Sequence, residues 1–109
     1  MAVAMRFLKK PESLVWVAAA FGGGVNNRDL CGFLTAGHMA LGVYAGDLKT
    51  ERKAAKDACG QKSREFWQWW LTVAPLHCAE IREGRTGSKV CQRLGKLAAA
   101  KIEDLIRPA

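Results

Sequence analysis

Apolar residues recur three and four positions apart along most of the chain, and this spacing predicts helices. Five helical segments are expected, at residues 11–21, 28–44, 48–72, 76–82 and 88–106. The last shows the pattern most plainly, with an apolar stripe at Cys91, Leu94, Ala98, Ile102 and Leu105. No stretch alternates apolar and polar residues as a strand would, so the sequence predicts an all-α bundle of four to five helices.

Glycine and asparagine mark the ends of the first two segments. Three glycines at positions 22–24 stop the first helix, and Asn26 and Asn27 are suited to cap the second. Inside the second helix, Gly32 and Gly37 each cost roughly 1 kcal/mol relative to alanine. We therefore expect a packing or site requirement at these two glycines.

The third expected helix, residues 48–72, combines an apolar stripe with a basic surface, and Gly60 could divide it into two pieces. Its basic residues are Lys49, Arg52, Lys53, Lys56, Lys62 and Arg64. Near its end lies an aromatic cluster of Phe66, Trp67, Trp69 and Trp70. We expect this cluster in the core or at a dimer interface rather than around a haem or flavin. The polar residues 83–87 are expected to form a loop.

A chain of 109 residues supports one domain, 1–109, of which residues 1–10 are expected to be a flexible N-terminal segment. The core is small for a monomer, and pairing with a second copy would bury more apolar surface, so we expect a homodimer. The longest uncharged run, between Asp29 and Asp47, is slightly too short to span a bilayer, and no export signal is recognisable. We therefore expect a cytoplasmic protein with no membrane span.

Lys and Arg number 17 and Asp and Glu number 10, which gives a net charge of +7. This excess favours an anionic partner, and the basic third helix could dock an acidic redox protein. Nucleic acid is the weaker interpretation, because no zinc finger, helix-turn-helix or RNA-binding aromatic motif accompanies the charge.

Four cysteines are the main candidates for chemistry. Cys31, Cys78 and Cys91 are each expected near the start of a helix, where free backbone N–H groups favour the thiolate. Cys59 is expected in the middle of a helix, on an apolar stripe. Neither CxxC nor CxxCH occurs, which excludes the common zinc motifs and covalent c-type haem attachment. From the residues alone, core filling and a shared site remain open.

The run from Phe21 to Gly24, the sequence CGFLT at 31–35 and the sequence MALG at 39–42 resemble the C-GCAxxG-C-C family of putative redox-active proteins. The resemblance covers residues 14–106 or so. It implies a helical, often dimeric domain whose cysteines form a redox or iron-binding cluster. The cysteines that it carries over are Cys31, Cys78 and Cys91. The structural motif that it carries over consists of Gly22, Gly23, Gly24 and Gly32.

The chain also departs from the family pattern. No cysteine precedes Cys31, although the family usually has a first cysteine on an N-terminal helix, which we expect to be missing here. Phe33 replaces the usual alanine, and Ala36 and Gly37 stand in the reverse order. Cys59 has no clear counterpart and is either core filling or a replacement for the first cysteine. These departures support an alternative function, a structural or interaction protein whose cysteine site has degenerated.

Three thiolates leave one position short of the usual four for an iron–sulfur cluster. Cys59, His77, His38 or a second subunit could supply the fourth ligand, although both histidines also fit ordinary structural roles. The sequence therefore predicts a redox or electron-transfer protein. Its cysteines would bind an iron–sulfur or other metal centre, or exchange between dithiol and disulfide.

Overall fold

The computed structural model describes residues 1–48, 50–81 and 88–107. Its elements are α1 (Ala2–Phe7), η1 (Glu12–Phe21), η2 (Gly24–Arg28), α2 (Gly32–Gly46), α3 (Arg52–Val73), α4 (Cys78–Ile81) and α5 (Ser88–Ile106). Across these ranges the fold is all-α, as the sequence predicts, with one isolated antiparallel β-bridge between Leu30 and His77. None of the helices in these ranges has both the length and the apolar character needed to cross a bilayer.

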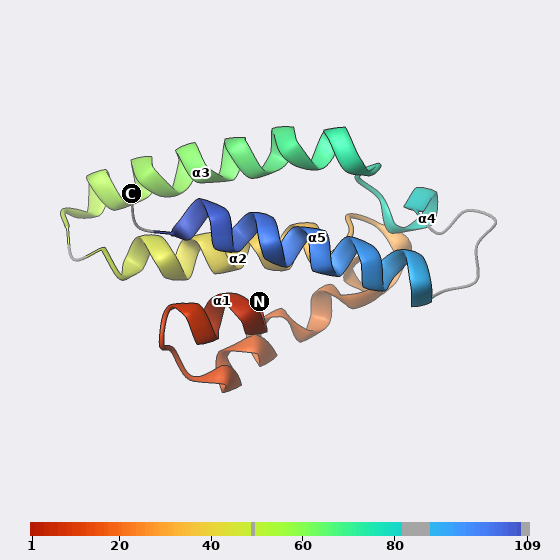
Figure 1. Ribbon diagram of the computed structural model, residues 1–109, viewed down its shortest axis with the longest axis horizontal. Coiled ribbons are helices and arrows are strands. Elements are labelled where there is room, and N and C mark those ends of the chain that lie inside the picture. Colours follow the sequence, from red (N-terminus) through yellow and green to blue (C-terminus); the bar gives the residue numbers. More distant parts are fainter. Residues whose placement is uncertain (49, 82–87, 108–109) are drawn as a thin grey trace.

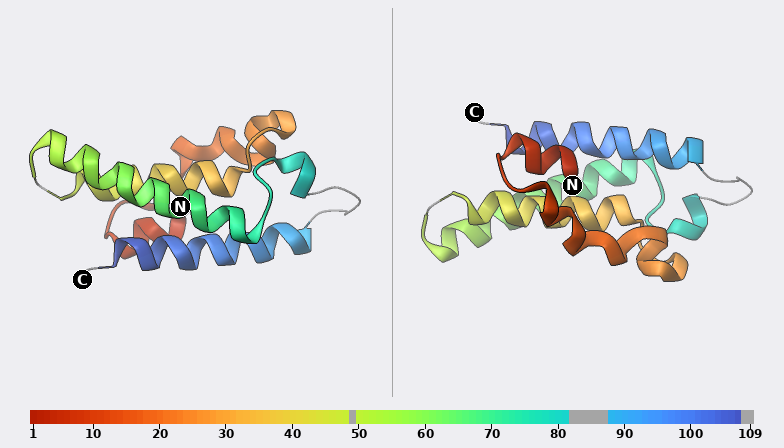
Figure 2. Two further views of the ribbon diagram at one scale, coloured as in Figure 1. Left: turned by 90° about the horizontal axis from the view of Figure 1, so that it is seen from above. Right: turned by 90° about the horizontal axis from the view of Figure 1, so that it is seen from below.

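Three long helices, α2, α3 and α5, run side by side and enclose the main core (Figure 1). The N-terminal part of the chain lies along one side of this group, with α1 against α5 and the 3₁₀ helix η1 against α2 (Figure 2). The short helix α4 lies at the end of the bundle where α5 begins. This arrangement brings the starts of α2, α4 and α5 to one end of the molecule.

A glycine sets the spacing between α2 and α3. Gly37 faces the Phe66 ring so closely that a Cβ added at Gly37 would lie 2.5 Å from a ring carbon. Phe66 and its neighbour Trp70 are fully buried. The predicted packing requirement at Gly37 is therefore confirmed, because any larger residue would displace a core aromatic ring.

Gly32 has a similar role against η1. A Cβ added there would lie 2.6 Å from the backbone oxygen of Phe21. The expected helix at 11–21 is present in the tighter 3₁₀ form, and its partly buried Val15, Ala18 and Phe21 are three residues apart. This spacing matches three residues per turn and turns one edge of η1 toward α2.

Several expected boundaries change. Residues 1–10, expected as a flexible segment, contain α1, whose Ala4 and Met5 are buried in the core. The α3 helix is continuous through Gly60. The α5 helix has the predicted bounds, whereas the expected loop at 83–87 lies outside the described residues.

The second helix begins at Gly32 rather than near residue 28, with Cys31 and not an asparagine at its N-cap. The reason is local backbone geometry. Val25, Asn26 and Arg28 have left-handed φ values of 60°, 58° and 54°, which a right-handed helix does not accommodate. The chain from Gly24 to Arg28 therefore forms an irregular turn that sets the direction of the segment leading to Cys31.

Two glycines of α2 provide a test of this packing. Gly37→Ala should lower the free energy of unfolding by about 1–3 kcal/mol, the usual cost of overfilling a packed core. Gly42→Ala is the matched control in the same helix, because Gly42 is exposed and no atom lies within 4 Å of an added Cβ. It should raise stability by up to about 1 kcal/mol through helix propensity. Urea denaturation of both variants measures the difference, and equal stabilities would contradict the packing described here.

Candidate functional site

Two segments far apart in the sequence pair at one end of the bundle. The Cys31 N–H donates a hydrogen bond to the Leu76 carbonyl oxygen at 2.9 Å, and the Cys78 N–H donates one to the Asp29 carbonyl oxygen at 2.7 Å. Together they form the antiparallel bridge centred on Leu30 and His77. Residues 29–31 and 76–78 are therefore held side by side, although more than 40 positions separate them.

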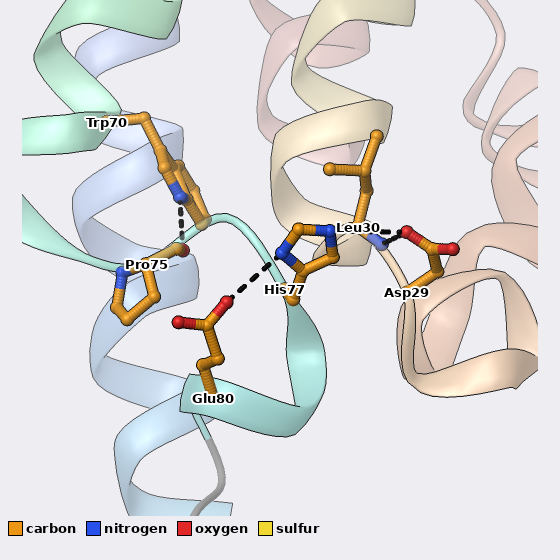
Figure 3. Close-up of polar contacts among 6 residues, drawn as sticks. All are labelled: Asp29, Leu30, Trp70, Pro75, His77 and Glu80. Atoms are coloured by element: carbon orange, nitrogen blue, oxygen red, sulfur yellow. Dashed lines mark hydrogen bonds and ion pairs between the residues drawn. The ribbon is translucent and has the colours of Figure 1, made fainter.

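The second of these segments is fixed by the end of α3. Ala74 is extended (φ −160°, ψ 159°), as expected for a residue before proline, so the helix ends at Val73. The buried Trp70 then donates its indole N–H to the Pro75 carbonyl oxygen at 2.8 Å (Figure 3). This bond anchors the chain just before it enters the bridge.

The paired segments carry both exposed and buried side chains. Cys31 directly follows Leu30 and Cys78 directly follows His77 in the two paired segments. His77 is on the outer face, with 46% of its side chain exposed. Cys31 and Cys78 are each only 7% exposed. The pairing therefore places two cysteines together on the buried side.

The third cysteine joins them from α5. Burial raises the pKa of the Cys31 thiol above its ordinary value, and the backbone N–H groups of Phe33 and Leu34 act in the opposite direction because they stabilise a thiolate. Nearby Cys78 and Cys91 raise this pKa further, because a second or third negative sulfur beside Cys31 would repel its charge. Cys78 and Cys91 therefore each lie within electrostatic reach of Cys31. We refer to Cys31, Cys78 and Cys91 as the three-thiol cluster.

Gly24 covers Cys78 from outside. Its φ is +65°, and a Cβ added there would lie 2.8 Å from the Cys78 Cβ and 2.4 Å from the Asp29 nitrogen. The Asp29 N–H in turn donates a hydrogen bond to the Gly24 carbonyl oxygen at 2.9 Å. Gly24, the last of the three glycines at 22–24, therefore contacts the site directly. The sequence predicts for these glycines the end of a helix and not a contact of this kind.

His77 faces away from the three-thiol cluster. Its Nδ1 donates a hydrogen bond to a Glu80 carboxylate oxygen at 3.1 Å, and its Nε2 lies 3.6 Å from an Asp29 carboxylate oxygen, as an ion pair when the ring is protonated (Figure 3). Asp29 also accepts a hydrogen bond from the Leu30 N–H at 2.8 Å. Both ring nitrogens thus face carboxylates on the outer side of the bridge. This arrangement does not match the role of fourth metal ligand that the sequence suggests for His77. The sequence pattern does not indicate that two acidic side chains lie beside this ring.

His38 and Cys59 are both engaged elsewhere. His38 Nδ1 donates a hydrogen bond to the Leu34 carbonyl oxygen at 2.8 Å, and its ring packs edge-on against Phe66 and Trp67 of α3. Cys59 is a partly exposed residue of α3, 14 residues before the end of that helix at Val73, or about 21 Å along its axis. Neither residue is positioned as a fourth member of the three-thiol cluster. The aromatic residues around Phe66 stack on one another as core, as expected.

These three cysteines follow the order that gives one protein family its name. The model of the family described as "Putative redox-active protein (C_GCAxxG_C_C)" matches residues 1–105. The chain belongs to this family. The match begins at residue 1 rather than near residue 14, so it includes α1 and η1, which contain no cysteine. A search of curated proteins and a search of solved structures each found no match.

Membership of the C_GCAxxG_C_C family raises the question of whether these residues fit a metal. In the part of the chain that the structure describes, no group of three or more His, Cys, Asp or Glu side chains is arranged to hold a metal ion. The three-thiol cluster also lacks the fourth thiolate of a usual iron–sulfur cluster. The described residues of this family member therefore do not fit such a centre by themselves. All four cysteines are free thiols, none in a disulfide.

Gly24 offers a test of how the cluster is covered. Gly24→Ala should lower stability by at least about 1–2 kcal/mol, because alanine is strained at positive φ, and should speed alkylation of Cys78 in the folded protein. Gly22→Ala is the control, since Gly22 has φ −57° and no atom within 4 Å of an added Cβ. Denaturation and mass-spectrometric alkylation rates report both effects. Unchanged alkylation of Cys78 in a destabilised Gly24→Ala variant would argue against the covering role.

The raised pKa of Cys31 predicts a loss of stability at high pH. Above the ordinary thiol pKa of 9.0, Cys31 releases its proton in the unfolded chain but keeps it in the folded chain. The unfolded state then binds fewer protons, so the free energy of unfolding falls as the pH rises through the folded-state pKa, and the full contribution remains below pH 9. Cys31→Ser should flatten this fall and Cys59→Ser should not. Denaturation under reducing conditions between pH 7.5 and 10.5 measures the slopes, and identical slopes would contradict the assignment.

Proposed function

We propose that this member of the C_GCAxxG_C_C family is a thiol redox protein whose centre is the three-thiol cluster, Cys31, Cys78 and Cys91. The centre would cycle between a dithiol and a disulfide. The observation that carries the proposal is the backbone pairing that holds the buried Cys31 and Cys78 in neighbouring segments, and the influence of Cys78 and Cys91 on the pKa of Cys31 supports it. Adjacent thiols are the requirement for forming an intramolecular disulfide.

Dithiol–disulfide exchange is favoured over a metal centre by the donor set. A cluster held by one chain would need a fourth ligand, and the described geometry of His77, His38 and Cys59 supplies none beside the three thiols. Exchange needs only two adjacent thiols and an oxidant. A metal centre completed by a second subunit remains the competing redox function, and the experiment below separates the two.

The proposal includes a location and partners. We place the protein in the cytoplasm, where thiols are kept reduced and cysteines serve redox chemistry more often than structural disulfides. The basic residues of α3 and the net charge of +7 favour docking by an acidic redox partner. A homodimer is supported by η1, where Trp16 is 77% exposed and Val17 is 57% exposed, because exposed apolar surface of this kind is typical of interfaces.

Counting thiols in anaerobically purified protein tests the proposal. We expect four titratable thiols in the denatured reduced protein and two after mild oxidation, with the disulfide inside the cluster and Cys59 free. Cys59→Ser is the matched control and should lose two of its three thiols on oxidation. Cys31→Ser should lose this response, and its circular dichroism spectrum should confirm that it is folded.

Two results would contradict thiol exchange, and each points to a different function. Stoichiometric iron with a visible absorption spectrum that disappears in Cys31→Ser would establish a metal centre instead. A colourless, metal-free protein that keeps four reduced thiols after oxidation would favour a structural or interaction protein with a degenerate site.

A further inference from the structure

A cavity lies where the end of α3, the short α4 and the start of α5 meet (Figure 1). Its volume is about 570 Å³, within the roughly 300–1,000 Å³ that is typical of small-molecule sites. Val73 and Leu97 in its wall are 41% and 39% exposed, so a ligand in the cavity would remove apolar surface from water. Most of the lining is aliphatic and consists of Val73, Pro75, Ile81, Val90, Leu94 and Leu97.

A row of basic side chains on α5 borders this cavity. Lys89, Arg93 and Lys96 are exposed and lie four and three residues apart, so they share one side of the helix. Together with Gln92 and Leu97 they line a second, more open hollow of about 420 Å³. Because Arg93 and Leu97 line both spaces, the basic row forms a rim of the apolar cavity.

The charge of the basic row is not balanced within the described part of the chain. Residues 88–102 include no aspartate or glutamate, and no described acidic side chain forms an ion pair with Lys89, Arg93 or Lys96. Further along the same helix, Lys101 does pair with Asp104, at 3.8 Å. Like charges four residues apart on a helix repel each other, so an anion bound at the row would relieve a repulsion that the protein itself leaves in place.

One carboxylate also lines the cavity, that of Glu80 on α4. It accepts the hydrogen bond from His77 Nδ1 at 3.1 Å and so is turned toward His77 (Figure 3). The acidic group is therefore on the α4 side of the cavity, and the basic row is on the α5 side. This asymmetry favours a ligand whose anionic group is at one end, directed toward α5.

We propose that the cavity and the basic row together bind an amphipathic organic anion, a small molecule with one apolar portion and one anionic group. The apolar portion lies in the cavity between α3 and α5, and the anionic group lies at the rim beside Arg93. No described cysteine lines either space, so this binding site does not rest on the proposed thiol exchange.

Two fluorescent probes test the proposed site. The probe 8-anilinonaphthalene-1-sulfonate carries one anionic group, and N-phenyl-1-naphthylamine has the same aromatic skeleton without it. We expect the folded, reduced protein to bind one sulfonate probe per chain and to bind the neutral probe more weakly. Arg93→Gln should weaken binding of the sulfonate probe about fivefold, the upper range for an exposed ion pair, and leave the neutral probe unchanged. Arg64→Gln is the matched control and should change neither, because Arg64 is an exposed arginine that lines neither space.

The apolar part of the site has its own pair of variants. Leu97→Gln should weaken both probes by similar factors, because it removes aliphatic lining that both contact. Leu71→Gln should weaken neither, since Leu71 is 49% exposed on α3 but does not line the cavity. Folded Cys31→Ser should bind both probes as the parent protein does, so the test is independent of whether the cysteines exchange disulfides.

Four results would overturn this inference. Equal dissociation constants of the sulfonate probe for the parent and for Arg93→Gln would remove the anionic half of the site, and so would equal affinity of the parent for both probes. Unchanged binding to Leu97→Gln, or loss of binding in Trp16→Ser on the exposed edge of η1, would place the probe elsewhere. The absence of saturable binding of the sulfonate probe would exclude the site altogether. Lys96→Gln provides a second rim variant if Arg93→Gln does not fold.

Discussion

The antiparallel pairing of residues 29–31 with residues 76–78 is the constraint on which the site depends. Two backbone hydrogen bonds, from Cys31 to Leu76 and from Cys78 to Asp29, join the start of α2 to the start of α4. Without them, nothing along the sequence would keep Cys31 beside Cys78, because the rest of α2 and the whole of α3 lie between the two. Since backbone groups make the bonds, the pairing does not depend on the identity of most side chains. The side chains instead decide which face is buried.

The rest of the fold positions these two segments next to each other. On one side, the left-handed turn at 24–28 redirects the chain after η1, and Gly24 allows it to lie against Cys78. On the other side, buried Trp70 holds the Pro75 carbonyl as the chain leaves α3. Gly37 lets the Phe66 ring approach α2 closely, which sets the distance between the two helices that carry these segments. Small residues and one tryptophan thus determine the position of the cysteines without belonging to the cluster.

The sequence predicts much of the fold, because helix periodicity is a local property. The predicted bounds of α5 agree with the structure, because its apolar stripe is regular and the helix begins at Ser88. The predicted start of α2 is wrong, because the left-handed backbone at Val25, Asn26 and Arg28 excludes a right-handed helix there. The α3 helix packs against α2 and is continuous through Gly60, so the propensity cost of one glycine does not interrupt it.

The cluster itself is harder to predict than the helices. The gaps between cysteines match no common motif, so their convergence could be expected only from resemblance to a family and not from spacing. His77 is the opposite case, a residue that the sequence suggests for the site and the structure places outside it. Its position next to Cys78 makes it a natural candidate ligand, but the His77 side chain is exposed beside two carboxylates whereas Cys78 is buried.

The surroundings of the three thiols bear on the chemistry that they can perform. Within the described residues, the core buries no charged or polar side chain, so no buried cation lies there to offset a thiolate. Burial and repulsion from the neighbouring sulfurs both favour the protonated form of Cys31, as its raised pKa indicates. The surroundings of Cys31 therefore favour a neutral sulfur, whether thiol or disulfide, over a thiolate.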